Sequence, residues 1–140
     1  MQNKQVYSKI GLYGTNDGVD LGYIDPTTIE TIAREASNQP LEAQAMVAKV
    51  IRQRSLERGL LPKEVVLQPL QFSCWNKGTA QSQRTPDEMA TAQKAWDMSV
   101  NIKDEPNLYH DTSVTPSWTK SKNVQFVKQI GKLKFYREKR

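Results

Sequence analysis

Three short segments of the sequence carry the side chains that could do chemistry. Glu35 stands at the end of a helical pattern, in the stretch REASNQP. Residues 68–75, QPLQFSCW, form an apolar loop rich in aromatic and amide groups, and residues 108–120, LYHDTSVTPSWTK, combine aromatic rings with hydroxyl groups and a histidine. Aromatic rings stack on the apolar faces of sugars, and amides and hydroxyls hydrogen-bond to sugar hydroxyls. These segments, together with the carboxylic acid of Glu35, therefore indicate a sugar-binding surface.

The same aromatic side chains also have a purely structural interpretation. Phe72, Trp75 and Trp118 could be core residues or could plug a loop, because large aromatic residues are usually well buried. His110 is the only histidine of the chain and could equally serve a structural role. None of these residues indicates a site by itself, so the hypothesis depends on their grouping with Glu35.

A helix is expected to position Glu35. Asp25 and Pro26 form a typical helix start, in which an N-cap residue precedes proline at the first helical position. Glu35 lies about 100° around the helix from its neighbour Ala36, so it flanks the apolar stripe and could face a cleft. The stripe follows the i, i+3, i+4, i+7 spacing of a helix, with Ile29, Ile32, Ala33 and Ala36.

Three further helices are expected, over residues 40–59, 62–67 and 86–100. Gly59 is typical of a helix end, and Thr85 and Glu88 can form a capping box at the start of the last helix. One face of the helix over residues 40–59 is apolar, so charged residues are expected on the opposite face. The residues expected to face outward are Arg52, Arg54 and Arg58.

The C-terminal segment changes from helical to alternating spacing. Apolar and polar residues alternate along residues 124–138, VQFVKQIGKLKFYRE, as they do in half-buried strands. Gly131-Lys132 can form a two-residue type II′ turn, and residues 107–111 could supply a third strand. Helices followed by a small antiparallel sheet predict an α+β fold.

Composition is that of one globular domain. The chain has 140 residues, of which 37% are hydrophobic and 25% charged. A single cysteine excludes a disulfide within the chain, and with a single histidine it gives no reason to expect a metal site or a cofactor. No apolar run approaches the roughly 20 residues of a membrane helix, and the N-terminus lacks the apolar region of a secretory signal. Membrane insertion is therefore not expected.

The positive charge is concentrated at the C-terminal end. The net charge of the chain is +5, whereas residues 117–140 alone hold eight basic residues and one acidic residue, a net +7. Such a segment favours anionic partners, such as nucleic acid, teichoic-type polymers or the carboxylates of peptidoglycan peptides, or it is simply a solvated face. A basic nucleic-acid-binding domain is a further class, but no recognition helix or stacking platform is evident, so nucleic acid is not expected as a partner.

Four segments in order resemble the SleB-type cell-wall hydrolase family, the spore-cortex-lytic group with relatives in phages and other bacteria. They are IETIAREASNQPLEAQAMVAKVIRQR, VVLQPLQFSCW, LYHDTSVTPSWTK and KQIGKLKFYRE, and the resemblance extends over about residues 29–137. It implies a helical domain like that of lysozyme and lytic transglycosylases, with a small antiparallel β-sheet near the C-terminus. Residues 25–140 would form this single catalytic domain, behind an irregular arm over residues 1–24.

The resemblance also implies site residues. Glu35 matches the first glutamate of the family's Glu-Ala-Arg-Gly-Glu-Pro stretch, which is the catalytic acid. The sequence departs from the pattern at Gln39, where the family has a second glutamate, and at Gln53, where it has asparagine. Gln44 matches the family's glutamine of the second helix and could orient Glu35 or a sugar, although it could also be an exposed helix residue. The residues expected to bind substrate are Gln44, Gln71, Phe72, Ser73, Tyr109, His110 and Trp118.

The implied substrate is peptidoglycan, cut in the glycan strand between N-acetylmuramic acid and N-acetylglucosamine. A free glutamic acid, with a pKa of about 4.3, is ionised at neutral pH, so the reaction requires apolar surroundings that favour its protonated form. Hydrolysis usually needs a second carboxylate, for which Asp111 is the best candidate. A lytic transglycosylase uses one glutamate twice and forms 1,6-anhydromuramic ends, and the sequence favours this reaction over that of a muramidase or glucosaminidase.

A non-enzymatic wall-binding or virion structural module on the same fold is the alternative, in which other virion proteins would also be partners. In either case no signal peptide is evident. We expect synthesis in the cytoplasm, and action on the cell wall after release as a phage lysin or after delivery in a virion.

Overall fold

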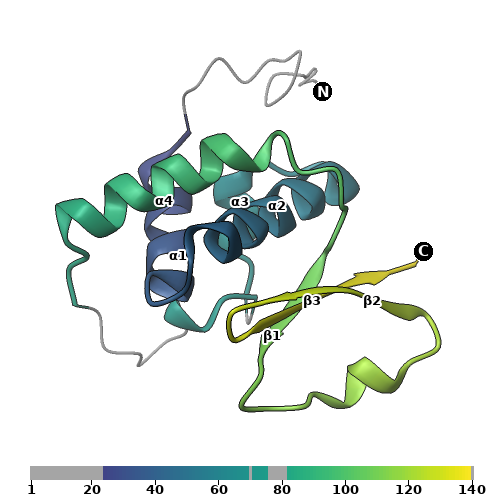
Figure 1. Cartoon of the computed structure of the whole chain (residues 1–140). Helices are drawn as coiled ribbons and strands as arrows, with labels where there is room; N and C mark the ends of the chain where they lie inside the picture. Colours follow the sequence, from purple (N-terminus) through teal and green to yellow (C-terminus); the bar gives the residue numbers. More distant parts are fainter. Residues whose placement is uncertain (1–23, 70, 76–81, 140) are drawn as a thin grey trace.

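The computed structural model describes residues 24–69, 71–75 and 82–139 (Figure 1). Four helices come first and a three-stranded antiparallel sheet of order β1-β3-β2 follows, which confirms the expected α+β fold. The expected N-terminal arm lies outside the described residues, apart from Ile24. The elements are α1 (Pro26–Ala36), α2 (Leu41–Arg58), α3 (Pro62–Val66), η1 (Ser73–Trp75), α4 (Pro86–Ser99), β1 (Leu108–Asp111), η2 (Ser117–Lys120), β2 (Val124–Ile130) and β3 (Leu133–Glu138). No helix within these ranges has the length and apolar character to cross a bilayer.

The helices begin and end at the residues that the sequence indicates. The Asp25 carboxylate accepts a hydrogen bond from the Thr28 backbone N–H at 2.7 Å and caps α1. Thr85 and Glu88 form the reciprocal capping box of α4. The left-handed conformation at the end of α2 is adopted by Gly59, with φ of +64°. Local capping therefore fixes the ends of the long helices.

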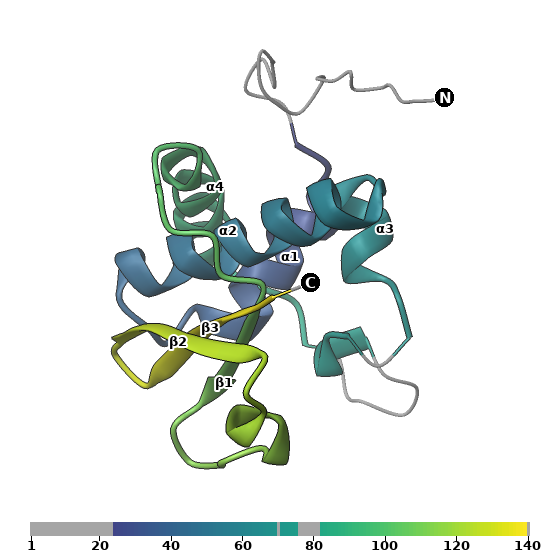
Figure 2. The same ribbon diagram turned by 90° about the vertical axis from the view of Figure 1, so that its right-hand side faces the viewer.

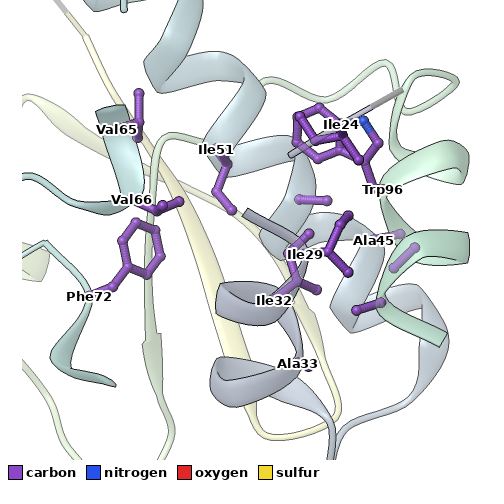
Figure 3. Close-up of a cluster of buried hydrophobic side chains, with 13 residues drawn as sticks. Ile24, Ile29, Ile32, Ala33, Ala45, Ile51, Val65, Val66, Phe72 and Trp96 are labelled. Carbon is purple, nitrogen blue, oxygen red and sulfur yellow. The ribbon is translucent and has the colours of Figure 1, made fainter. Parts of the chain in front are cut away.

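Helix α2 is the centre of the fold and is buried on more than one side. One apolar cluster joins α1, α2, α3 and α4, and Figure 3 shows Phe72 pointing toward Val66 within it. A second cluster joins the ends of α1 and α2 to the sheet through Leu133 and Phe135. Because α2 packs against helices on one side and the sheet on the other, it offers little free surface for charged residues.

The expectation that three arginines of α2 face outward is therefore wrong. Arg54 is only 7% exposed. The guanidinium of Arg52 lies 3.9 Å from the ring centroid of Trp96, and Arg58 donates hydrogen bonds to the side chains of Gln68 and Gln71. The guanidinium group of each of these arginines contacts another segment of the chain.

The sheet has one face against the helices and one face turned away from them (Figure 2). Strand β3 is central, and Leu133 and Phe135 point from it into the second apolar cluster. The expected Gly131-Lys132 turn joins β2 to β3, with Gly131 at φ of +58°. The Lys132 backbone N–H donates to the Gln39 side chain at 2.9 Å, so this hairpin is attached to the corner between α1 and α2. The sheet is thereby held beside the C-terminal end of α1, where Glu35 lies.

Candidate active site

Glu35 meets Tyr109 at the junction between the helices and the sheet. Glu35 occupies the last turn of α1 and is partly buried, and Tyr109 is in the middle of β1. The Tyr109 hydroxyl donates a hydrogen bond of 2.6 Å to Oε1 of Glu35. The Tyr109 ring packs against Phe135, with 5.7 Å between the ring centroids. Two segments 74 residues apart in the chain are thus joined at one carboxylate.

A second donor reaches Glu35 from the loop that contains η1. The Cys74 thiol hydrogen-bonds to the Glu35 side chain. Burial raises the pKa of Cys74 to about 12, and the neighbouring carboxylate adds to the effect. Burial likewise raises the pKa of the Tyr109 phenol well above its usual range, again with a contribution from Glu35. Both groups are therefore neutral hydrogen-bond donors at neutral pH.

Arg54 adds a buried positive charge next to this pair. Burial lowers its pKa to about 10, and both Tyr109 and Glu35 are close enough to act on it electrostatically. The guanidinium therefore stays protonated at neutral pH. Its Nε donates to the backbone carbonyl of Asn107 at 2.8 Å, and its Nη1 has no hydrogen-bond partner within the described residues.

Arg54 also joins the two segments that carry the donors to Glu35. Its guanidinium carbon lies 5.4 Å from the ring centroid of Phe72, two residues before Cys74. Its bond to Asn107 fixes the chain two residues before Tyr109. A single side chain of α2 therefore positions both the η1 loop and the start of β1.

The predicted residues of the η1 loop have different environments. Phe72 is 2% exposed and belongs to the core, whereas Ser73 and Gln71 are exposed. The Gln71 side chain accepts a hydrogen bond from Arg58 at 3.0 Å. The Trp75 indole N–H donates to the Thr31 hydroxyl at 2.8 Å and attaches the loop to α1. Phe72 therefore anchors the loop in the core, whereas Gln71 and Ser73 are exposed on its surface.

Gln44 is buried in α2 rather than exposed. Its side-chain amide donates to the backbone carbonyl of Gln39 at 3.1 Å, and its Oε1 has no partner among the residues that the structure describes. The hydrogen bond from Gln44 to Gln39 therefore fixes the turn between α1 and α2, which follows Glu35.

His110 and Trp118 are not brought together with Glu35. Successive residues of a strand point to opposite faces of the sheet, so Tyr109 faces the helices and His110 faces away from them. The ring of His110 lies 5.7 Å from that of Trp118, and its Nε2 is 3.0 Å from the Tyr136 hydroxyl. The predicted binding residues thus divide between two faces of the sheet.

Asp111, the candidate second carboxylate, is exposed at the end of β1. Its side chain accepts a hydrogen bond of 2.8 Å from the Ser113 backbone N–H. This bond lowers the pKa of Asp111 below its ordinary value, so the group is ionised at neutral pH. Ser113, the hydrogen-bond partner of the Asp111 side chain, belongs to the same turn as Asp111. Within the described ranges, no group of three or more histidine, cysteine or acidic residues could hold a metal ion.

A comparison with protein families identifies the family to which the chain belongs. A family model described as cell wall hydrolase matches residues 38–136. The chain belongs to the cell wall hydrolase family. The SleB-type resemblance and the expectation of an enzyme are thereby confirmed, and degradation of peptidoglycan is the activity of this cell wall hydrolase.

The fold of this cell wall hydrolase also matches a solved structure. It is similar to the catalytic domain of the germination-specific lytic transglycosylase SleB from Bacillus anthracis, with a TM-score of 0.58 and 24% sequence identity. The likeness covers 84% of this chain and 98% of that domain, and it confirms the expected lysozyme-like fold. A search of curated proteins found no match.

Two residues of the candidate site, Cys74 and Arg54, were not predicted from the sequence of the hydrolase. Cys74 gave no signal of its own, because a lone cysteine is usually a small buried apolar residue. Arg54 was assigned to the outer face of its helix, although its position in the stretch VIRQR matched the Arg of the family pattern. The family model starts at residue 38, so the matched residues begin just after Glu35.

Proposed function

We propose that this cell wall hydrolase is a lytic transglycosylase that cleaves between N-acetylmuramic acid and N-acetylglucosamine with Glu35 as its only catalytic carboxylate. The observation that supports the proposal is the 2.6 Å hydrogen bond from Tyr109 to Glu35, in a partly buried corner between α1, the η1 loop and β1. A carboxyl group held by neutral donors at the edge of a core can exchange a proton with a substrate and stay in place while doing so.

In the first step, protonated Glu35 gives its proton to the oxygen that leaves with N-acetylglucosamine. The bond between that oxygen and C1 of the muramic residue breaks, and positive charge develops on the sugar ring. Glu35 becomes a carboxylate at the same moment. The hydroxyl of Tyr109 and the thiol of Cys74 donate to it, and the positive charge of Arg54 lies nearby.

In the second step, the Glu35 carboxylate takes the proton of the C6 hydroxyl of the same muramic residue. The C6 oxygen attacks C1 and closes a 1,6-anhydro ring. Glu35 returns to its protonated form, so one residue serves first as acid and then as base. The balance requires no water and no second carboxylate.

The position of Asp111 favours this reaction over hydrolysis by two carboxylates. A retaining or inverting hydrolase holds its two carboxyl groups about 5–10 Å apart across the scissile bond. Asp111 is exposed and bound to Ser113 in its own turn, and its side chain has no described contact with the Glu35 corner. Water-mediated hydrolysis would need another group to activate the water.

Two measurements test the proposal. Clearing of purified sacculi, followed by turbidity, is expected to be lost in Glu35→Gln and retained in Glu105→Gln, in which an exposed glutamate is replaced in the same way. Mass spectrometry of the soluble products is expected to show 1,6-anhydromuramic ends. Reducing muramic or glucosamine ends would instead indicate a muramidase or a glucosaminidase, and equal clearing by both variants would remove Glu35 from the mechanism.

A further inference from the structure

The face of the sheet turned away from the helices carries a continuous group of four aromatic rings. Tyr136 of β3 is at its centre, with its ring centroid 5.4 Å from that of His110, 5.2 Å from that of Trp118 and 5.5 Å from that of Phe126. These rings come from β1, η2, β2 and β3. We call this group, defined by His110, Trp118, Phe126 and Tyr136, the outer aromatic surface.

Internal hydrogen bonds hold the outer aromatic surface in one arrangement. The Nδ1 atom of His110 lies 2.7 Å from the carbonyl oxygen of Asp111 and must donate to it, because a carbonyl only accepts. In the neutral ring Nε2 is then the acceptor, and the Tyr136 hydroxyl donates to it at 3.0 Å. The loop that carries η2 is fixed at its start by the bond from Thr112 N to Lys132 O at 2.8 Å. The surface is therefore preformed.

Packing of the η2 loop does not account for all of these rings. Tyr136 is 8% exposed and is covered by its neighbours, whereas Phe126 is 53% exposed and Trp118 is partly exposed. Val114 in the same loop is 54% exposed. A phenylalanine on a sheet surface gains nothing from facing water, but an exposed ring beside other rigid rings can bind the apolar face of a sugar at little cost in entropy.

Basic residues outnumber acidic residues around the outer aromatic surface. Lys134 lies opposite His110 in the strand register and points to the same face. Lys120 ends η2, and Lys122 follows it as an exposed residue. Glu138 lies two residues beyond Tyr136 on the same face, so these four charged residues leave a net positive charge there. The ligand that fits is therefore a sugar polymer that carries negative charge.

We propose that the outer aromatic surface binds a second stretch of peptidoglycan, away from the Glu35 corner. Sugar rings stack on Phe126 and Trp118, and carboxylates of the peptides attached to muramic acid lie near Lys120 and Lys134. The identity of the ligand rests on the proposed function. A second copy of the chain fits less well, because two faces of the same positive charge repel each other.

Binding is tested without turnover, in the Glu35→Gln background, by co-sedimentation with purified sacculi. Adding Phe126→Ala is expected to weaken binding about threefold to tenfold, from the loss of one stacking ring. Leu56→Ala is the matched control, because Leu56 is an exposed apolar residue of α2, 73% exposed, and is expected to leave binding unchanged. Equal binding by the two variants would overturn the proposal.

The charged part of the surface has its own test. The double substitution of Lys120 and Lys134 by glutamine is expected to weaken binding and to make it less sensitive to added salt, because fewer charge pairs are screened. The double substitution of Lys63 in α3 and Lys94 in α4 by glutamine removes two exposed charges elsewhere and is the control. A soluble probe, chitotetraose, followed by NMR, is expected to shift the signals of Trp118 and Phe126, because it can stack but carries no charge.

The outcomes separate this proposal from the proposed function. Clearing of sacculi by Glu35→Gln would refute the catalytic role of Glu35 but would leave the chitotetraose result unaffected. NMR shifts confined to the residues around Glu35 would refute sugar binding at the outer aromatic surface. They would leave the enzyme mechanism intact. A dimer in sedimentation velocity that Phe126→Ala abolishes would assign the surface to a second copy instead.

Discussion

Replacing Tyr109 with phenylalanine removes one hydrogen bond from the catalytic carboxylate and little else. The ring packs against Phe135 through its carbon atoms, and phenylalanine keeps that contact. The lost group is the hydroxyl that donates to Glu35 at 2.6 Å. Because Glu35 carries its full negative charge only after it has given up its proton, the bond strengthens as the reaction proceeds.

The size of the effect follows from the type of bond. Hydrogen bonds to charged groups contribute about 1.5–3 kcal/mol, and the same loss in the transition state slows a reaction about 10- to 150-fold. We expect Tyr109→Phe to lower the turnover rate on sacculi by this factor. The free energy of unfolding should fall by only about 1 kcal/mol, the usual contribution of a single hydrogen bond.

The assay is the initial rate of release of soluble muropeptides at neutral pH, with urea denaturation of the same samples. Ser55→Ala is the matched control, because it removes another largely buried hydroxyl, which donates to the carbonyl of Leu60 away from the site. It should lose similar stability and keep the parent rate. A Tyr109→Phe enzyme with the parent rate, or a Ser55→Ala enzyme that is equally slow, would refute the role assigned to Tyr109.

Four other substitutions, two of them compared with each other, test the surroundings of the site and the hairpin. Arg54→Met leaves the Asn107 carbonyl without its donor, so the free energy of unfolding measured with urea should fall by about 1–3 kcal/mol. Cys74 favours its thiol form in the folded protein, with a pKa of about 12 against an ordinary 9.0, so its contribution to stability is complete below about pH 9 and is lost as the pH rises toward 12. Between about pH 9 and pH 12, the melting temperature of Cys74→Ser should therefore fall less than that of the parent. Gly131→Ala should destabilise more than Gly59→Ala in urea titrations: both have positive φ, which costs about 1–2 kcal/mol, but only at Gly131 would the new Cβ meet other atoms, at 2.6 and 2.9 Å. Equal losses for the two alanine variants would mean that the hairpin is not in contact with the helix corner.

Much of the fold could be predicted from the sequence, because its signals are local. The proline at the start of α1, the glycine after α2 and the alternation along β2 and β3 each act over a few residues. The order of helices and strands then predicted the fold class, and the resemblance indicated Glu35. Tyr109 could be placed in a strand and in the site by the same means.

The rest depends on contacts between distant segments. Arg54 was misassigned because α2 was treated as a helix with one buried face, whereas the sheet covers a second side. His110 and Trp118 were grouped with Tyr109 because they are close in sequence. Neighbouring residues of a strand point to opposite faces of the sheet. His110 therefore lies on the other face of the sheet from Tyr109, although the two are adjacent in sequence.

The alternation of Tyr109 and His110 along β1 has a geometric consequence for how the enzyme would meet its substrate. A glycan lying on the far side of the sheet has to bend round an edge strand before it can enter the catalytic corner. A long strand, or two neighbouring strands of an intact wall, could occupy both places. Such an enzyme would favour the cross-linked mesh over the fragments that it releases, and would let go of its own products.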